Sequence, residues 1–120
     1  MMKILLMIFA LAFPFCNCLG KTYTDADRKE TCSELNAEIP VEYAKMGLTP
    51  EVFSLRISYD AKTDSMLLSY SGTMVKSATV EDLRNSWITR LKPDGIAAFR
   101  GMGFKHFFFY ANGKNCAYRL

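Results

Sequence analysis

Residues 104–120, FKHFFFYANGKNCAYRL, contain a complete two-stranded hairpin. Asn112-Gly113 separates two runs of strand-forming residues, and Asn-Gly is the preferred pair in a two-residue type I′ turn. A turn of this length fixes the register of the strands that flank it. The predicted pairs are Ala111 with Lys114, Phe109 with Cys116, Phe107 with Tyr118, and His106 with Arg119.

The hairpin has two faces, because successive side chains along a strand point to opposite sides. One face is apolar, and we expect it to pack on the core: Phe107, Phe109, Cys116, Tyr118 and Leu120. The other is the candidate binding face, formed by His106, Phe108, Tyr110, Asn115 and Arg119, with Phe104 and Ala117 beside them. Two interpretations of it stay open. It binds an anion, another ligand or a protein partner, or a second helix covers it through Trp87 and leaves a solvated polar rim.

A second hairpin is predicted within residues 52–70, where apolar side chains recur at every second position. Residues 60–65 are rich in turn formers. If Asp60 faces Ser65 across the loop, Tyr59 meets Met66 and the apolar side chains of both strands share one face.

A first helix is predicted over residues 25–38. Thr24 precedes Asp25 and Asp27, as is typical of a helix start, and Pro40 is expected to end the element. Helical spacing puts one apolar stripe on the buried side, formed by Cys32, Leu35 and Ile39. The charged side chains, Arg28 among them, are expected to face solvent. We expect residues 40–50 to form an ordered connection.

A middle helical segment is predicted from Thr79 to about Lys92, with Asp82 completing the helix start. Its apolar stripe is Val80, Leu83, Trp87 and Leu91. Pro93-Asp94-Gly95 breaks it, and one or two further helical turns follow before Gly101 or Gly103. The predicted fold class is therefore α+β: a small antiparallel sheet of two hairpins, with an N-terminal helix and this middle segment packed on it.

The amino terminus is typical of a signal peptide, with Lys3 followed by an uncharged apolar stretch that ends near residue 20. Small residues at Cys18 and Gly20 favour a cut before Lys21. The predicted organisation is a cleaved signal peptide, residues 1–20, and one domain, residues 21–120. The apolar stretch is short for a membrane span, so we expect no stable membrane anchor after cleavage. Lipidation of Cys16 or Cys18 is the competing fate.

Cleavage leaves two of the four cysteines, Cys32 and Cys116. An exported domain with two cysteines far apart in sequence most simply pairs them, so a Cys32–Cys116 disulfide is predicted. A redox or metal-binding role is the weaker interpretation, because the two cysteines are not closely spaced and the chain has a single histidine.

Charge does not favour a nucleic-acid partner. Loss of Lys3 reduces the 15 basic residues to 14 against 12 acidic ones, and the basic residues are dispersed along the chain. Catalytic-nucleophile motifs, phosphate-binding glycine loops and metal-ligand spacings are absent from the sequence. We therefore predict no cofactor and no metal.

The function predicted from these features is an exported, periplasmic or secreted, non-enzymatic binding module. Its partner would be another envelope or extracellular protein, in an inhibitor, immunity-type or accessory role. One alternative is a small hydrolase or nuclease using His106 and Arg119, which requires a carboxylate near His106 in a cleft. Another is a carrier of a small apolar ligand, which requires a closed apolar cavity. A flat, exposed aromatic patch favours the binding module.

Overall fold

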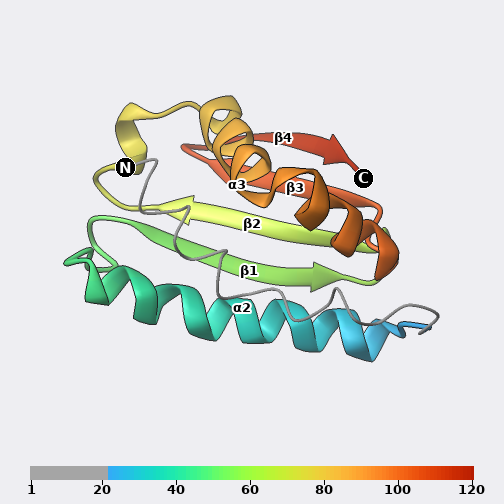
Figure 1. The fold of residues 1–120 in the computed structure, drawn as a ribbon. Coiled ribbons are helices and arrows are strands. Elements are labelled where there is room, and N and C mark those ends of the chain that lie inside the picture. The colour runs from blue at the N-terminus through green and yellow to red at the C-terminus, as the bar shows by residue number, and fades with distance from the viewer. Residues whose placement is uncertain (1–21) are drawn as a thin grey trace.

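The computed structural model describes residues 22–120 as two helices packed on a four-stranded sheet (Figure 1). In chain order the elements are α2 (Asp25–Lys45), β1 (Ser54–Asp60), β2 (Ser65–Ser71), the short 3₁₀ helix η2 (Val75–Ser77), α3 (Val80–Gly101), β3 (His106–Ala111) and β4 (Lys114–Arg119). The predicted signal peptide and its cleavage site lie outside the described residues. None of the described helices is both long and apolar enough to cross a bilayer.

The sheet is mixed, which corrects the prediction of an antiparallel one. Its order is β1-β2-β3-β4, and the two hairpins meet through a parallel pairing of β2 with β3. The connection explains this arrangement. α3 returns the chain to the end of the sheet at which β2 begins, so β3 runs parallel to β2.

Both predicted hairpin registers are confirmed. Ala111 lies opposite Lys114 and His106 opposite Arg119 in the second hairpin, as the two-residue turn requires. In the first hairpin, Asp60 lies opposite Ser65 and Tyr59 opposite Met66. Since register determines which face each side chain occupies, the composition of both sheet faces follows from these pairs.

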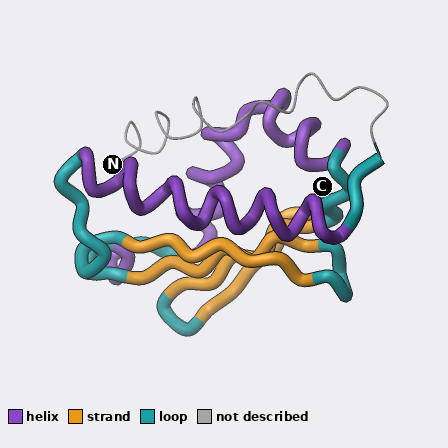
Figure 2. The backbone as a smooth tube through the Cα atoms, turned by 90° about the horizontal axis from the view of Figure 1, so that it is seen from below, coloured by secondary structure: helices purple, strands orange, loops and turns teal. Residues whose placement is uncertain are grey.

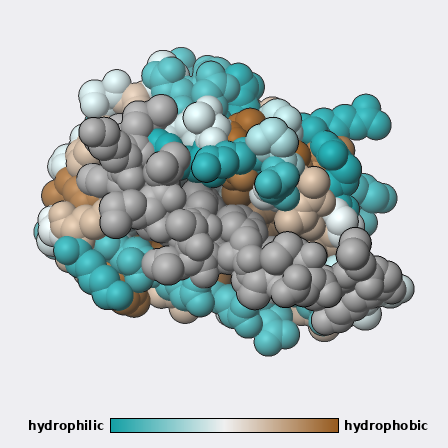
Figure 3. Space-filling view, viewed as in Figure 1, coloured by the Kyte–Doolittle hydropathy of each residue, from teal (hydrophilic) through white to brown (hydrophobic). Residues whose placement is uncertain are grey.

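Both helices lie on the same side of the sheet, so the molecule has two layers (Figure 2). α2 runs along β1, and α3 packs on β3 and β4. The core lies between the layers: Trp87 and Phe99 of α3 contact Phe107 of β3, with ring centroids 5.9 and 5.6 Å apart. Seen from the helix side, hydrophilic side chains follow the lower margin of the molecule, where α2 runs (Figure 3).

α2 begins where predicted but continues seven residues beyond the predicted end at Glu38, to Lys45. Thr24 and Asp27 form a reciprocal capping box at its start. Pro40 sits inside the helix, although it supplies no backbone N–H. Tyr43 anchors the turn after Pro40, since it is 2 % exposed and packs edge-on against Phe53 at 5.0 Å.

The predicted break in the middle helical segment is confirmed. Lys92, directly before Pro93, has φ 60 and ψ 170, which interrupts the helical backbone within α3. A residue before proline is disfavoured in the α region, which explains the position of the break. A capping box of Thr79 and Asp82 starts the helix, as predicted.

The structure does not support the predicted disulfide, because Cys32 and Cys116 are both free thiols. Cys32 lies on α2, which packs along β1, whereas Cys116 lies on β4 at the other edge of the sheet. Three strand spacings separate these edges by about 14 Å. A disulfide joins Cα atoms that are about 7 Å apart at most.

Candidate binding face

No described helix covers the side of the sheet opposite the helices (Figure 2). We call this surface the open face: Arg56, Ser58 and Asp60 of β1, Ser65, Leu67 and Ser69 of β2, His106, Phe108 and Tyr110 of β3, and Asn115, Ala117 and Arg119 of β4. Strand alternation explains this set, because the residues between them point into the core.

The open face is ordered in rows that cross all four strands. The central row is Ser58, Leu67, Phe108 and Ala117, and one flanking row is Arg56, Ser69, Tyr110 and Asn115. The other flanking row is Asp60, Ser65, His106 and Arg119. Apolar side chains therefore lie at the centre, and polar or charged side chains lie at the ends of the rows.

Aromatic side chains form the centre of the open face. Phe108 is half-buried, and the His106 ring stacks on it with centroids 5.5 Å apart and planes 19° apart. Tyr110, in the next row, is 39 % exposed. Tyr110 and Val41 are the exposed large hydrophobic residues of the described chain, and Val41 lies on α2 in the other layer. The open face thus presents its own apolar surface.

Two cations lie at opposite corners of this face. Arg56 and Arg119 are exposed, and neither takes part in an ion pair among residues 22–120. The acid at the corner beside them, Asp60, accepts hydrogen bonds from Lys62 N at 3.1 Å and Thr63 Oγ1 at 2.9 Å within its own turn. With two arginines against one acid, Asp60, the open face carries a net positive formal charge.

His106 has no acidic partner within the described chain. Its buried Nδ1 lacks a hydrogen-bond partner there, and its side chain forms no ion pair. In its row Ser65 separates it from Asp60, so this acid is two strands away, about 9.6 Å. A carboxylate that orients a histidine does so through a hydrogen bond, at about 3 Å. The carboxylate required by the hydrolase alternative is not placed beside His106.

The five candidate residues predicted from the sequence lie together on the open face. The helix that carries Trp87 does not cover them. Trp87 lies on the other side of the sheet, 1 % exposed, against the core residue Phe107. Phe104 also belongs to the core, because its ring packs against Tyr59 at 5.8 Å and Phe99 at 5.7 Å. The interpretation in which the α3 helix covers the open face is wrong.

Sequence reasoning missed the half of the open face that β1 and β2 contribute, which includes Arg56, Ser58, Leu67 and Ser69. The register of the first hairpin already placed these residues on a common face. What was missing is the parallel pairing of Leu67 with Phe108, which joins the two hairpin faces into one surface.

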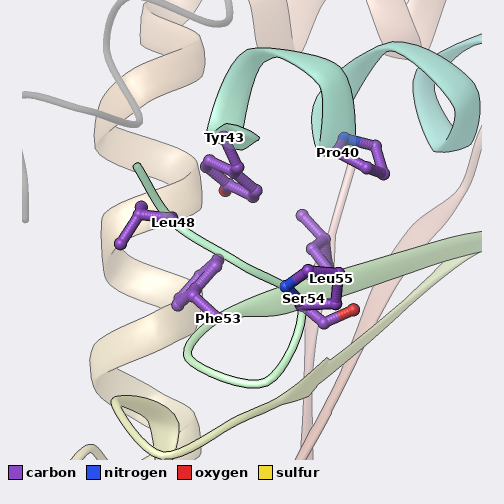
Figure 4. Close-up of a pocket in the computed structure, with 7 residues that line it drawn as sticks. Pro40, Tyr43, Leu48, Phe53, Ser54 and Leu55 are labelled. Atoms are coloured by element: carbon purple, nitrogen blue, oxygen red, sulfur yellow. The ribbon is translucent and has the colours of Figure 1, made fainter. Parts of the chain in front are cut away.

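A separate pocket lies at the end of α2, away from the open face. Figure 4 shows Pro40 and Tyr43 of α2 facing Phe53, Ser54 and Leu55, with Leu48 at one side. Its cavity volume is only about 20 Å³. Ligand pockets usually measure about 300 Å³ or more, so this pocket does not meet the requirement of the carrier alternative.

Two arginines are buried away from the open face. Arg28, expected at the surface, is 9 % exposed and donates to Tyr59 Oη at 2.9 Å and to Met102 O at 2.9 Å. Arg90 on α3 is 4 % exposed, and burial lowers its pKa. Neither side chain lies on the open face, because both come from helices in the other layer.

The thiols show no sign of chemical activation. Burial raises the pKa of Cys32 to about 12. Burial also raises the pKa of Cys116, whose Sγ lies 3.8 Å from Val80 O. A reactive cysteine needs a lowered pKa. In the described part of the chain, no three His, Cys, Asp or Glu side chains form a group that could hold a metal ion.

Comparisons of this chain with protein-family models, with curated proteins and with solved structures find no match.

Proposed function

We propose that this chain is an exported, non-catalytic binding module whose open face docks onto an acidic surface of another envelope or extracellular protein. The observation that carries the proposal is Tyr110. It is an exposed aromatic side chain beside half-buried Phe108 and Leu67, on a sheet face that no described element covers. Tyrosine and arginine, together with tryptophan, are the residue types that most often anchor protein interfaces.

Charge complementarity supports the acidic nature of the partner. Arg56 and Arg119 flank the aromatic centre without carboxylate partners among the described residues. A partner that brings two carboxylates to these corners would form charge-assisted hydrogen bonds around an apolar centre. Like charges would be repelled at the same positions, which gives the face selectivity.

Export is supported by the sequence of residues 1–20, with Lys3 before an uncharged apolar stretch and small residues before Lys21. The compartment would be the periplasm or the extracellular space. Cleavage before Lys21 predicts that protein isolated from the native cell has the mass of residues 21–120.

The test is to capture partners on purified protein and to compare affinities of variants for the captured protein. Tyr110→Ala and Arg119→Ala are each expected to weaken binding about thirtyfold, the effect of losing an interface anchor worth about 2 kcal/mol. Both should retain the thermal midpoint of the unchanged protein, because exposed side chains contribute little to folding.

Val41→Ala and Arg100→Ala are the matched controls. Val41 is exposed on α2 and Arg100 is exposed on α3. These controls remove one exposed apolar side chain and one exposed arginine from the helix layer, as Tyr110→Ala and Arg119→Ala do from the open face. Each control should bind as the unchanged protein does. Equal affinity of all four variants would refute the proposal, and so would a captured ligand that proves to be single-stranded nucleic acid stacked on Tyr110 and Phe108.

A further inference from the structure

The two edges of the sheet differ. β1 forms one edge, and α2 runs beside it: Asn36 Oδ1 of α2 accepts a hydrogen bond from Ile57 N at 2.8 Å. This contact satisfies an edge amide that would otherwise be free to pair with another strand. β4 forms the other edge, and no described element lies beyond it (Figure 1).

The hairpin register identifies the free backbone groups of β4. In a two-residue hairpin the residues flanking the turn, Ala111 and Lys114, form a hydrogen-bonded pair, and such pairs then alternate along the strands. Leu120 N donates to Lys105 O at 2.8 Å, which confirms that the even-numbered residues of this strand pair inward. The backbone N–H and C=O groups of Asn115, Ala117 and Arg119 therefore point outward.

These same three residues place their side chains on the open face. A strand added beside β4 would consequently be hydrogen-bonded to the backbone of Asn115, Ala117 and Arg119 and would extend the open face by one strand. All three are exposed, and so is Lys114 at the start of β4. Backbone pairing and side-chain contacts would be available to one ligand at once.

The positive charge of β4 determines which kind of strand could pair with this edge. Its residues include Lys114 and Arg119 and no acid. Pairing with a second copy of β4 would bring four cations onto one short ladder without a counter-charge, which disfavours a dimer through this edge. An extended segment with carboxylates would place opposite charges across the same ladder.

We propose that β4 captures an extended acidic segment of the partner protein by strand addition, which makes it a fifth strand of the sheet. This inference rests on the proposed function and names the mode of recognition. Main-chain hydrogen bonds supply affinity in such complexes, and alternate side chains supply specificity.

Cys116 makes a direct test feasible, because it permits chemical ligation of residues 21–115 to a synthetic peptide of residues 116–120. The whole exported chain can thus be assembled with an N-methyl group on Ala117, which removes one outward donor and no bond to β3. A second version replaces the Ala117 amide by an ester, which removes the same donor without adding a methyl group. Circular dichroism and the thermal midpoint verify that both versions fold.

The probe is a fluorescent, capped octapeptide of alternating Glu and Val, and its matched control alternates Lys and Val. The Glu peptide should bind the unmodified chain, and both Ala117 modifications should weaken it about tenfold or more, because one main-chain bond and the fit beside it are lost. The Lys peptide should not bind. Amide exchange at Asn115, Ala117 and Arg119 should slow when the Glu peptide is present.

Any of the following results would overturn strand addition. One is no measurable binding of the Glu peptide, and another is equal affinity for the unmodified and modified chains. If the affinity falls with Tyr110→Ala but not with either Ala117 modification, the peptide lies across the open face. Docking on the open face would then hold, and strand addition at β4 would not. A concentration-dependent dimer that the Ala117 modifications abolish would show that the occupant is a second copy.

Discussion

Arg28 illustrates how a charged residue can occupy a buried position. Its charge favoured the surface, yet it lies four residues before Cys32 and seven before Leu35, on the same stripe of α2. Its guanidinium donates to Tyr59 of β1 and to Met102 at the end of α3. Gly103 makes room for it, since a Cβ there would lie 2.7 Å from Arg28 Nη1. Helical spacing already indicated the buried side, whereas the acceptors come from distant segments of the chain and could not be predicted from it.

Replacing this guanidinium should be costly. Arg28→Met is expected to lower the free energy of unfolding by about 2 to 3 kcal/mol, because a buried carbonyl and a hydroxyl lose a charged donor. The neighbouring exposed Lys29 provides the control, and Lys29→Met should change stability by less than about 0.5 kcal/mol. Urea unfolding of the three proteins measures this difference, and equal midpoints would contradict the role of Arg28.

The Asp25 carboxylate adds a pH dependence to the same cluster. Hydrogen bonds from Arg28 and then Tyr59 hold the pKa of Asp25 below its ordinary value of 3.8. A lowered pKa in the folded state stabilises the protein above pH 3.8, and this contribution disappears as the pH falls through the folded-state pKa. Asp25→Asn should therefore be less stable than the unchanged protein at neutral pH, and their midpoints should converge in acid. A constant difference between pH 7 and pH 2 would exclude this linkage.

At the scale of elements, the turns were predictable and the pairing between hairpins was not. Asn112-Gly113 determines its turn locally, and so the pairs from Ala111 and Lys114 to His106 and Arg119 follow from sequence. The break beside Pro93 is local too. By contrast, the parallel pairing of β2 with β3 joins segments on either side of α3, and no short motif encodes it.

Proline misled the prediction of α2 for a related reason. Pro40 costs one helical hydrogen bond, a local penalty, but Tyr43 and its contact with Phe53 compensate from outside the helix. The same long-range geometry does not support the disulfide, because α2 and β4 lie at opposite edges of the sheet. In both cases tertiary packing, and not local sequence, decides the outcome.

Asn36 is the residue by which α2 closes the β1 edge. Asn36→Ala should lower the free energy of unfolding by about 1 to 3 kcal/mol, because the partly buried Ile57 amide would lose its acceptor. Asn36→Asp retains an acceptor oxygen and should preserve most of that stability. Amide exchange at Ile57 should accelerate in the alanine variant alone, and unchanged exchange would mean that α2 does not protect this edge.

At the scale of the whole molecule, the segregation of both helices to one side creates the candidate site. Each hairpin sequence predicted one apolar and one mixed face, but only the assembled sheet merges Arg56, Leu67, Phe108, Tyr110 and Arg119 into a single surface. The candidate residues on β3 and β4 were thus predictable, whereas the exposure of their face was not. That exposure depends on which side of the sheet Trp87 occupies.

Site-specific photo-crosslinking in the native cell tests the use of the open face most directly. A photoreactive benzoylphenylalanine is placed at Tyr110 in one variant and at Val41 in another, the two exposed large hydrophobic positions, one on each side of the molecule. Irradiation should link a discrete protein through position 110 and not through position 41. The same adduct through position 41, or a discrete adduct there with none at position 110, would contradict docking on the open face.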